Sequence, residues 1–154
     1  MAGALALEPA TLASARAIAQ LSRQHVEDGL GWRYRAATIV RYIRDPDVEV
    51  VIARHEGDVA GFAVAEFHAE HVHLVLLAVG PQYRRTGMGR KLIEWIEIMA
   101  RDAGIFRMVL EVRARRPDAR AFYEALGYRR VRRLPGYHLG REDALRMERD
   151  LHIV

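Results

Sequence analysis

The chain has 154 residues, 51% of them hydrophobic, and a formal net charge of +4 at pH 7. This composition suits one folded domain over residues 1–154 and leaves no apolar run of about 18 residues, the length that a membrane-spanning helix needs. Because the chain contains no cysteine, disulfides, thiolate metal sites and a cysteine nucleophile are all excluded.

The N-terminal third predicts two helices. Residues 11–27 carry apolar side chains at helical spacing with Thr11 as the expected N-cap, and Gly29–Tyr34 interrupts the pattern. A shorter helix then ends at Asp45, because the residue before a proline disfavours the helical conformation. The N-terminal segment contains an acidic residue and lacks the basic start of a secretory signal, so we expect a cytoplasmic protein.

The middle of the chain predicts three strands, over residues 48–55, 59–67 and 71–79. Glu56–Asp58 forms a short polar turn between the first two, and His68–Glu70 forms one between the last two. Turns this short connect antiparallel neighbours, so both pairs are expected to be hairpins.

The C-terminal half predicts helices and strands in alternation. A helix over about 87–103 precedes a buried strand, residues 106–113, and a second helix runs from Asp118, its expected N-cap, to Leu126. A glycine follows each helix as its expected C-terminal cap, and two strands around a loop at 135–141 close the chain. The order α-α-β-β-β-α-β-α-β-β predicts an α/β fold with a mixed sheet and helices on its faces.

The positive charge of the chain is spread along it and is almost entirely arginine. The densest cluster, Arg129-Arg130 with Arg132-Arg133, alternates around Val131 as a strand with a solvated face would. Nucleic acid is therefore not expected as the main partner. An acidic peptide or a phosphorylated cofactor would use the same charge.

Residues 81–92, PQYRRTGMGRKL, place two glycines one residue apart directly before the predicted helix. A Walker loop needs Gly-Lys followed by Ser or Thr, whereas Gly89 is followed by Arg90, Lys91 and Leu92. A dinucleotide fingerprint needs a third glycine at the position of Leu92. The turn predicts a different anion site, made by backbone N–H groups at the helix start.

The run Arg84-Arg85-Thr86-Gly87-Met88-Gly89, after the strand LLAV and opening a helix, resembles the acyl-CoA pyrophosphate loop of the GNAT N-acetyltransferases. The segments LEVR, AFYEALGY, PGY and EDALRM are similar to the ribosomal-protein-alanine N-acetyltransferases, a branch of that family. Residues 1–45 match mainly in their two-helix layout. The resemblance implies a GNAT fold, in which two parallel strands splay apart to form an acetyl-CoA cleft.

The resemblance also implies where acetyl-CoA binds. Its pyrophosphate would accept hydrogen bonds from backbone N–H groups between Arg85 and Arg90, and its pantetheine arm would pair with the edge of the preceding strand. Arg116 stands where the family often has an asparagine that helps to hold the cofactor. The implied cofactor-binding residues are Leu77, Ala78, Val79, Arg84, Arg85, Thr86, Gly87, Met88, Gly89, Arg90 and Arg116.

Two catalytic residues follow from the same resemblance. Glu111 takes the position of the general base, acting through a water, and Tyr123 takes that of the general acid toward the CoA sulfur. The residues alone leave alternatives open. Glu111 could be a solvated strand carboxylate or an ion-pair partner of Arg113, and Tyr123 could be a half-buried tyrosine that packs on the sheet.

The acceptor end of the cleft is assigned to Trp32, Tyr34, His73 and Tyr137, each of which has packing or a polar strand-end position as its alternative. His73 could share the base role with Glu111. Its spacing from His68 and His71 would suit a metal, but no cysteine or carboxylate completes the set at a fixed spacing, so no metal is expected.

The sequence therefore predicts an acetyl-CoA-dependent N-acetyltransferase that transfers acetyl directly to an amine, here the N-terminal α-amine of a protein such as a ribosomal protein. The alternatives are an acetyltransferase for a small amine (a polyamine, an aminoglycoside or an amino acid) and a non-catalytic acyl-CoA-binding module. The expected assembly is a monomer or a homodimer, with no membrane partner.

Overall fold

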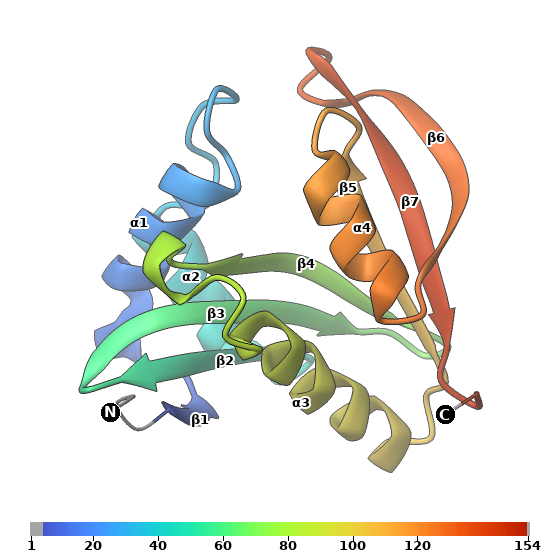
Figure 1. Ribbon diagram of the computed structural model, residues 1–154. Helices are drawn as coiled ribbons and strands as arrows, with labels where there is room; N and C mark the ends of the chain where they lie inside the picture. Colours follow the sequence, from blue (N-terminus) through green and yellow to red (C-terminus); the bar gives the residue numbers. More distant parts are fainter. Residues whose placement is uncertain (1–4, 154) are drawn as a thin grey trace.

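The computed structural model describes residues 5–153, and these form helices packed on one mixed sheet (Figure 1). Residues 1–4 and 154, which the predicted domain includes, lie outside the described residues. The strands are β1 (Leu5–Pro9), β2 (Val48–His55), β3 (Asp58–Phe67), β4 (Val72–Val79), β5 (Arg107–Arg113), β6 (Arg129–His138) and β7 (Glu142–Asp150). The α-helices are α1 (Ala15–His25), α2 (Ala36–Arg44), α3 (Met88–Asp102) and α4 (Pro117–Ala125), and the short 3-10 turns are η1 (Leu12–Ser14) and η2 (Pro81–Tyr83).

The sheet has seven strands in the order β1-β2-β3-β4-β5-β7-β6. Strands β4 and β5 are parallel, and every other neighbouring pair is antiparallel, as the two predicted hairpins require. The mixed α/β fold predicted from the element order is therefore confirmed. Among the described residues, no helix is long and apolar enough to cross a membrane.

The splay between β4 and β5 decides where a ligand can enter. The two strands pair only from Val72 to Leu74, opposite Met108 to Leu110, and then separate (Figure 1). Val75 has no partner on β3, because the register there steps from Ala65–Leu74 to Val64–Leu76. An extra residue of this kind bends its strand, so the bulge in β4 lies at the point where the cleft opens.

Hydrophobic side chains on the two faces of the sheet form two cores. Alternate residues of β2 and β3 point to opposite faces, so Val51 and Ala63 pack under α3 while Ile52 and Phe62 pack under α1 and α2. On α3, Leu92, Ile93, Ile96 and Ala100 are buried toward the first core. The part of the sheet from β2 to β4 is thus covered by helices on both faces, and the cleft begins where β4 and β5 part.

Two strands differ from the sequence prediction. Strand β1 was not predicted: it has only five residues, and it depends on antiparallel pairing with β2, whose partner positions lie more than forty residues away. Strand β6 continues to His138, through the predicted loop at 135–141. A break in the β6–β7 register between Leu134 and His138 accommodates Pro135 and Gly136, because a bulge tolerates residues that a regular ladder does not.

The predicted N-caps are wrong, whereas the C-terminal glycines are confirmed. Thr11 precedes the 3-10 turn η1 and caps nothing with its side chain, and α1 begins at Ala15. Asp118 lies within the first turn of α4, because Pro117 takes the first helical position that proline favours. Gly104 and Gly127 follow α3 and α4 with φ of 75° and 96°, the left-handed geometry of a helix C-terminus.

Candidate active site

The turn before α3 exposes unpaired backbone N–H groups. Gly87 is the N-cap of α3 at φ 84°, and no side chain caps the helix. The first intrahelical bond from this end is donated by Lys91 N to Gly87 O, at 3.0 Å. The N–H groups of Met88, Gly89 and Arg90 therefore lack intrahelical acceptors, and a Cβ on Gly87 would meet nothing within 4 Å. The helix start is open to an anion.

Side chains of the same turn divide into exposed and buried ones. Arg84, Arg85 and Arg90 are exposed, but Met88 is 2% exposed and packs against Gly61. The predicted cofactor contact of Met88 is thus available only from its backbone. A Cβ on Gly89 would lie 3.1 Å from Cζ of Phe122, so this glycine also allows α3 and α4 to approach each other.

A cavity of about 230 Å³ lies where β4 and β5 separate. It brings together seven of the residues that the sequence predicted: Tyr34, His73, Leu77, Glu111, Arg116, Tyr123 and Tyr137. The phosphate-loop residues do not line this cavity, and neither do Ala78 and Val79, whose side chains pack in the cores on the two faces of the sheet. The predicted catalytic pair therefore shares one cavity, and the turn before α3 lies outside its lining.

The carboxylate of Glu111 contacts three polar side chains, of which Tyr137 and Arg146 are donors. His73 Nε2 lies 2.6 Å from its Oε1, the Tyr137 hydroxyl donates to the same oxygen at 3.0 Å, and Arg146 Nε donates to Oε2 at 3.1 Å. Its side chain is 6% exposed. Burial acts to raise the pKa of Glu111, but the hydrogen bonds outweigh burial and hold the pKa below its ordinary value. The ionised form is the resting form, and its ion-pair partner is Arg146, not Arg113 as one alternative supposed.

His73 lies between two carboxylates. Its Nε2 faces Glu111, and its Nδ1 lies 3.4 Å from Oε1 of Glu66. Burial acts to lower the pKa of His73, but hydrogen bonds and charges from Glu111 and Glu66 raise the pKa above its ordinary value of 6.5. His73 is therefore in direct contact with the predicted base and is not an isolated polar residue at a strand end.

Tyr123 lies on α4 and is 8% exposed. Its ring meets those of Phe122 and Tyr128 edge to face, at centroid distances of 5.1 and 5.7 Å. Burial raises the pKa of its phenol, which therefore keeps its proton at neutral pH. The Tyr123 side chain therefore packs against its aromatic neighbours and also lines the cavity.

The sequence of residues 14–128 matches the acetyltransferase (GNAT) family. The chain belongs to the GNAT family. Its segment of 94 residues, 59% of the chain, is 36% identical to the [Ribosomal protein bS18]-alanine N-acetyltransferase of Escherichia coli K12. That alignment spans 64% of the relative, which is less than two thirds of its length.

Solved structures of GNAT proteins resemble the whole described fold. The ribosomal-protein-S18-alanine N-acetyltransferase from Escherichia coli superimposes with a TM-score of 0.80 at 26% identity, over 96% of this chain and 94% of that one. Ard1 from Thermoplasma volcanium superimposes with a TM-score of 0.86 at 22% identity, over 96% and 98% of the two chains. Together with the family match, these superpositions confirm the GNAT fold. The splayed parallel strands are seen in this chain, where β4 and β5 pair only from Val72 to Leu74.

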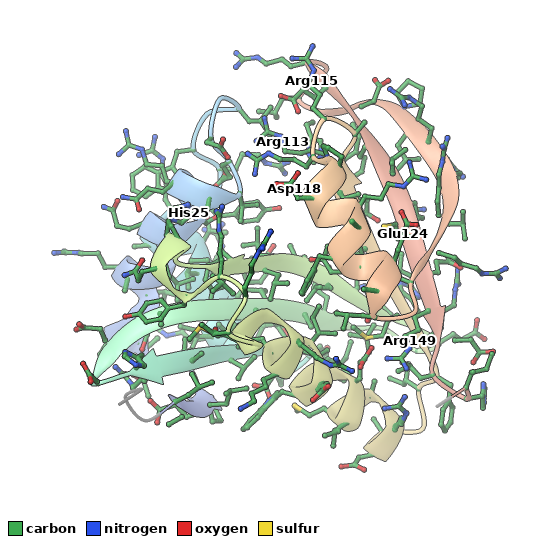
Figure 2. All side chains as sticks on the ribbon, viewed as in Figure 1. His25, Arg113, Arg115, Asp118, Glu124 and Arg149 are labelled. Carbon is green, nitrogen blue, oxygen red and sulfur yellow. The ribbon has the colours of Figure 1, made fainter. Side chains whose placement is uncertain are left out.

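A set of hydrogen bonds that the sequence did not predict connects the residues after β5 with the loop after α1. Arg113 donates to Asp28 O at 2.8 Å and to Val26 O at 3.3 Å, and Arg116 donates to the Asp28 carboxylate. Figure 2 shows Arg113 reaching from the end of β5 toward the loop that follows α1. Glu142 accepts two further bonds from Arg113. Arg116, the replacement for the family asparagine, thus contacts the opposite wall.

The acceptor-side aromatic residues separate into two groups. Tyr34 and Tyr137 line the cavity, whereas Trp32 packs in the core under α1 and α2 and does not line it. The guanidinium groups of Arg23 and Arg35 lie 5.0 and 4.8 Å from the centre of the Trp32 ring. The structure therefore places Trp32 in a packing position and the two tyrosines at the site.

Sequence reasoning missed Glu66, Arg146 and Glu27. Glu66 and His73 are directly opposite in the β3–β4 hairpin, so the predicted turn, with its register, could have identified the pair. Arg146 on β7 lies opposite Glu111 on β5, and no pattern in the neighbouring sequence predicts which strands pair or in which register. Glu27 accepts from the backbone N–H of Arg33 at 2.6 Å, and so fixes the loop that carries Tyr34. Within residues 5–153, no group of three His, Asp or Glu side chains has an arrangement that could hold a metal.

Proposed function

We propose that this protein is an acetyl-CoA-dependent N-acetyltransferase that transfers acetyl directly to the N-terminal α-amine of a protein. The observation that carries the proposal is the single cavity at the strand splay, which Glu111 and Tyr123 both line. The relatives support the choice of acceptor, since the names of both Escherichia coli proteins describe an alanine N-acetyltransferase of a ribosomal protein. We further propose that residues 1–154 act as one domain in the cytoplasm, as a monomer or homodimer.

The residues present fit acetyl-CoA. The free N–H groups of Met88, Gly89 and Arg90, with the positive end of the α3 dipole, suit a pyrophosphate, and the open space at Gly87 leaves room for it. Beyond Leu74, the β5-facing edge of β4 has no strand partner, so its backbone at Leu77 can pair with a pantetheine arm. Acetyl-CoA supplies the acetyl group as a thioester.

On the acceptor side, Glu111 accepts the proton of the incoming ammonium group, and His73, which contacts Glu111, shares this base role. A protein α-amine has a pKa of about 8, so a moderate base suffices to give the neutral nucleophile. The negative carboxylates of Glu111 and Glu66 also attract the cationic amine before it is deprotonated. Tyr34, between α1 and α2, and Tyr137, near the end of β6, flank its path, because both line the cavity.

On the leaving-group side, Tyr123 donates its phenolic proton to the sulfur as the carbon–sulfur bond breaks. The raised pKa ensures that the phenol is protonated when it is needed. Where water is excluded, no solvent molecule can solvate or protonate the departing thiolate, so a proton donor from the protein favours its departure. Tyr123 can supply that proton, because it is 8% exposed and lines the cavity from α4.

The proposal is tested by measuring acetyl-CoA turnover against a set of N-terminal peptides and a set of small amines, including polyamines, aminoglycosides and amino acids. We expect turnover with peptides, highest with those whose first residue is small. Faster turnover of free polyamines or antibiotics than of every peptide would assign the protein to the small-amine acetyltransferases. Calorimetric binding of acetyl-CoA with no turnover of any amine would identify a non-catalytic acyl-CoA-binding module.

A further inference from the structure

Four titratable side chains form a continuous line from the cavity to the surface. Beyond Glu111, His73 contacts Glu66, and Oε1 of Glu66 lies 3.7 Å from Nε2 of His68. The exposed fraction of the side chains rises along this line, from 6% at Glu111 through 24% at His73 and 32% at Glu66 to 48% at His68. The line ends in the β3–β4 turn, where the His68 ring stacks on His71.

The acetyl-transfer reaction has a proton to dispose of. A protonated amine loses two protons when it becomes an amide. The overall reaction places one of them on the departing sulfur, because Tyr123, which protonates the sulfur, must regain its own proton. One proton per turnover must therefore reach solvent. Glu111 cannot retain it, because the hydrogen bonds from Tyr137 and Arg146 stabilise its ionised form.

We propose that this proton leaves the cleft through His73, Glu66 and His68, an inference that rests on the proposed acetyl transfer. The amine proton passes to Glu111 and then to Nε2 of His73. The Nδ1 proton of the imidazolium passes to Glu66, and His68 takes it from Glu66 and releases it to water. Each group returns to its starting charge, but His73 is left with its proton on Nε2 instead of Nδ1. The starting tautomer is restored by proton exchange with water, which can reach the His73 side chain because it is 24% exposed, and the relay is then ready for the next turnover. Glu66 and His68 act through His73 and are positioning residues.

Other charged and titratable groups surround the relay. Arg146 and Tyr137 contact Glu111 from β7 and β6. Tyr34 and Tyr42 pack on the same half of the sheet as Glu66, in the core under α1 and α2. Arg33 lies beside Tyr34, and the His71 ring stacks on that of His68. Among these groups, Glu66 and His68 continue the line of contacts from His73 to the turn, so Glu66 is the residue whose removal should interrupt it.

The decisive experiment is the kcat of Glu66→Gln at low buffer concentration, with imidazole then added. We expect kcat to fall about tenfold, equivalent to about 1.4 kcal/mol of barrier, with the KM for acetyl-CoA unchanged. Because imidazole carries protons itself, we expect it to restore the rate of the variant while leaving the wild type unaffected. Glu70→Gln is the matched control, since Glu70 is an exposed carboxylate of the same turn and makes no contact in the relay.

A second measurement does not depend on turnover. The NMR titration of His73 should give a pKa above 6.5 in the wild type and a lower one in Glu66→Gln, because one of its two carboxylate partners is lost. The acid limb of the kcat profile should move to lower pH by the same amount. An unchanged His73 titration, or a loss of kcat that imidazole does not repair, overturns the relay. Absence of wild-type turnover with an intact His73 shift would instead contradict the proposed function.

Discussion

The two ends of the cleft are built from different parts of the chain. At the proposed cofactor end, the proposed anion site consists of consecutive backbone N–H groups at the start of α3, and the side chains around it are exposed or face the core. At the acceptor end, the site consists of side chains: Glu111 from β5, His73 from β4, Tyr137 from β6 and Arg146 from β7. The residues of the cofactor end are neighbours in the sequence, whereas those of the acceptor end are distant in the sequence and are brought together by the pairing of the strands.

This difference has consequences for substitution. A backbone site depends on the shape of one turn and tolerates changes of side-chain charge, because N–H donors are present at every residue except proline. A side-chain network depends on each member, because removal of one partner leaves a buried group unsatisfied. We therefore expect substitutions at the acceptor end to change the chemistry, and substitutions at the cofactor end to change binding.

The largest effect is expected at Tyr123, which lies between the two ends. Tyr123→Phe removes the proton donor and keeps the packed ring, so kcat should fall by about 10²–10⁴-fold while acetyl-CoA affinity changes far less. Tyr128→Phe is the matched control: it removes a hydroxyl that donates to buried Glu97 at 2.9 Å, and should lower the free energy of unfolding by about 1–3 kcal/mol without a comparable loss of kcat. A Tyr123→Phe rate within about twofold of wild type, under about 0.5 kcal/mol, would leave the phenol with a structural role alone.

Glu111→Gln tests the acceptor end directly. We expect kcat to fall by about 10²-fold, because the amide cannot accept the amine proton and Arg146 loses its ionic partner. The loss should shrink at high pH, where the amine deprotonates without help. Steady-state kinetics across pH provide the measurement, with Glu124→Gln on the exposed side of α4 as a control that should match wild type. A pH-independent loss would argue against a base role for Glu111.

Gly87→Val tests the cofactor end. Valine is strained at φ 84°, at a cost of about 1–3 kcal/mol, and its side chain would occupy the anion site, so the Kd of acetyl-CoA should rise about tenfold or more. Gly104→Val is the control, because Gly104 also has positive φ and open space but lies at the other end of α3. Isothermal titration calorimetry should separate the two variants although both are destabilised. Equal Kd values would remove the anion site from the turn before α3.

The smallest effect is the pH dependence of stability at the acceptor end. The pKa of His73 is raised, so its stabilising contribution is complete below pH 6.5 and is lost as the pH rises through the raised value. The pKa of Glu111 is lowered, so its contribution is complete above pH 4.5 and is lost as the pH falls through the lowered value. Urea unfolding should show the largest difference between wild type and His73→Gln between these two pH values. A difference that grows above pH 6.5 would contradict the assignment.

The cofactor end could be predicted from the sequence because its determinants are neighbours in the chain. The run from Arg84 to Gly89 specifies a strand-to-helix turn by itself, and the structure has that turn. At the acceptor end, the sequence could suggest individual residues but not the contacts between them. Glu111 and Tyr137 were chosen through resemblance, but their mutual hydrogen bond and the ion pair with Arg146 depend on the pairing of β5, β7 and β6. Strand pairing over such distances has no local signal, which is also why β1 was missed.

Both outer strands of the sheet carry features that discourage the addition of another strand. At one edge, the described part of β1, Leu5–Pro9, ends in Pro9, which has no N–H to donate. At the other edge, β6 has a bulge and four exposed arginines among residues 129–133. Like charges would face each other if two such edges met, so aggregation through this strand is opposed. The arginine cluster that gives the chain its most basic segment thus serves colloidal stability, and substituting it with threonines would create an aggregation-prone edge.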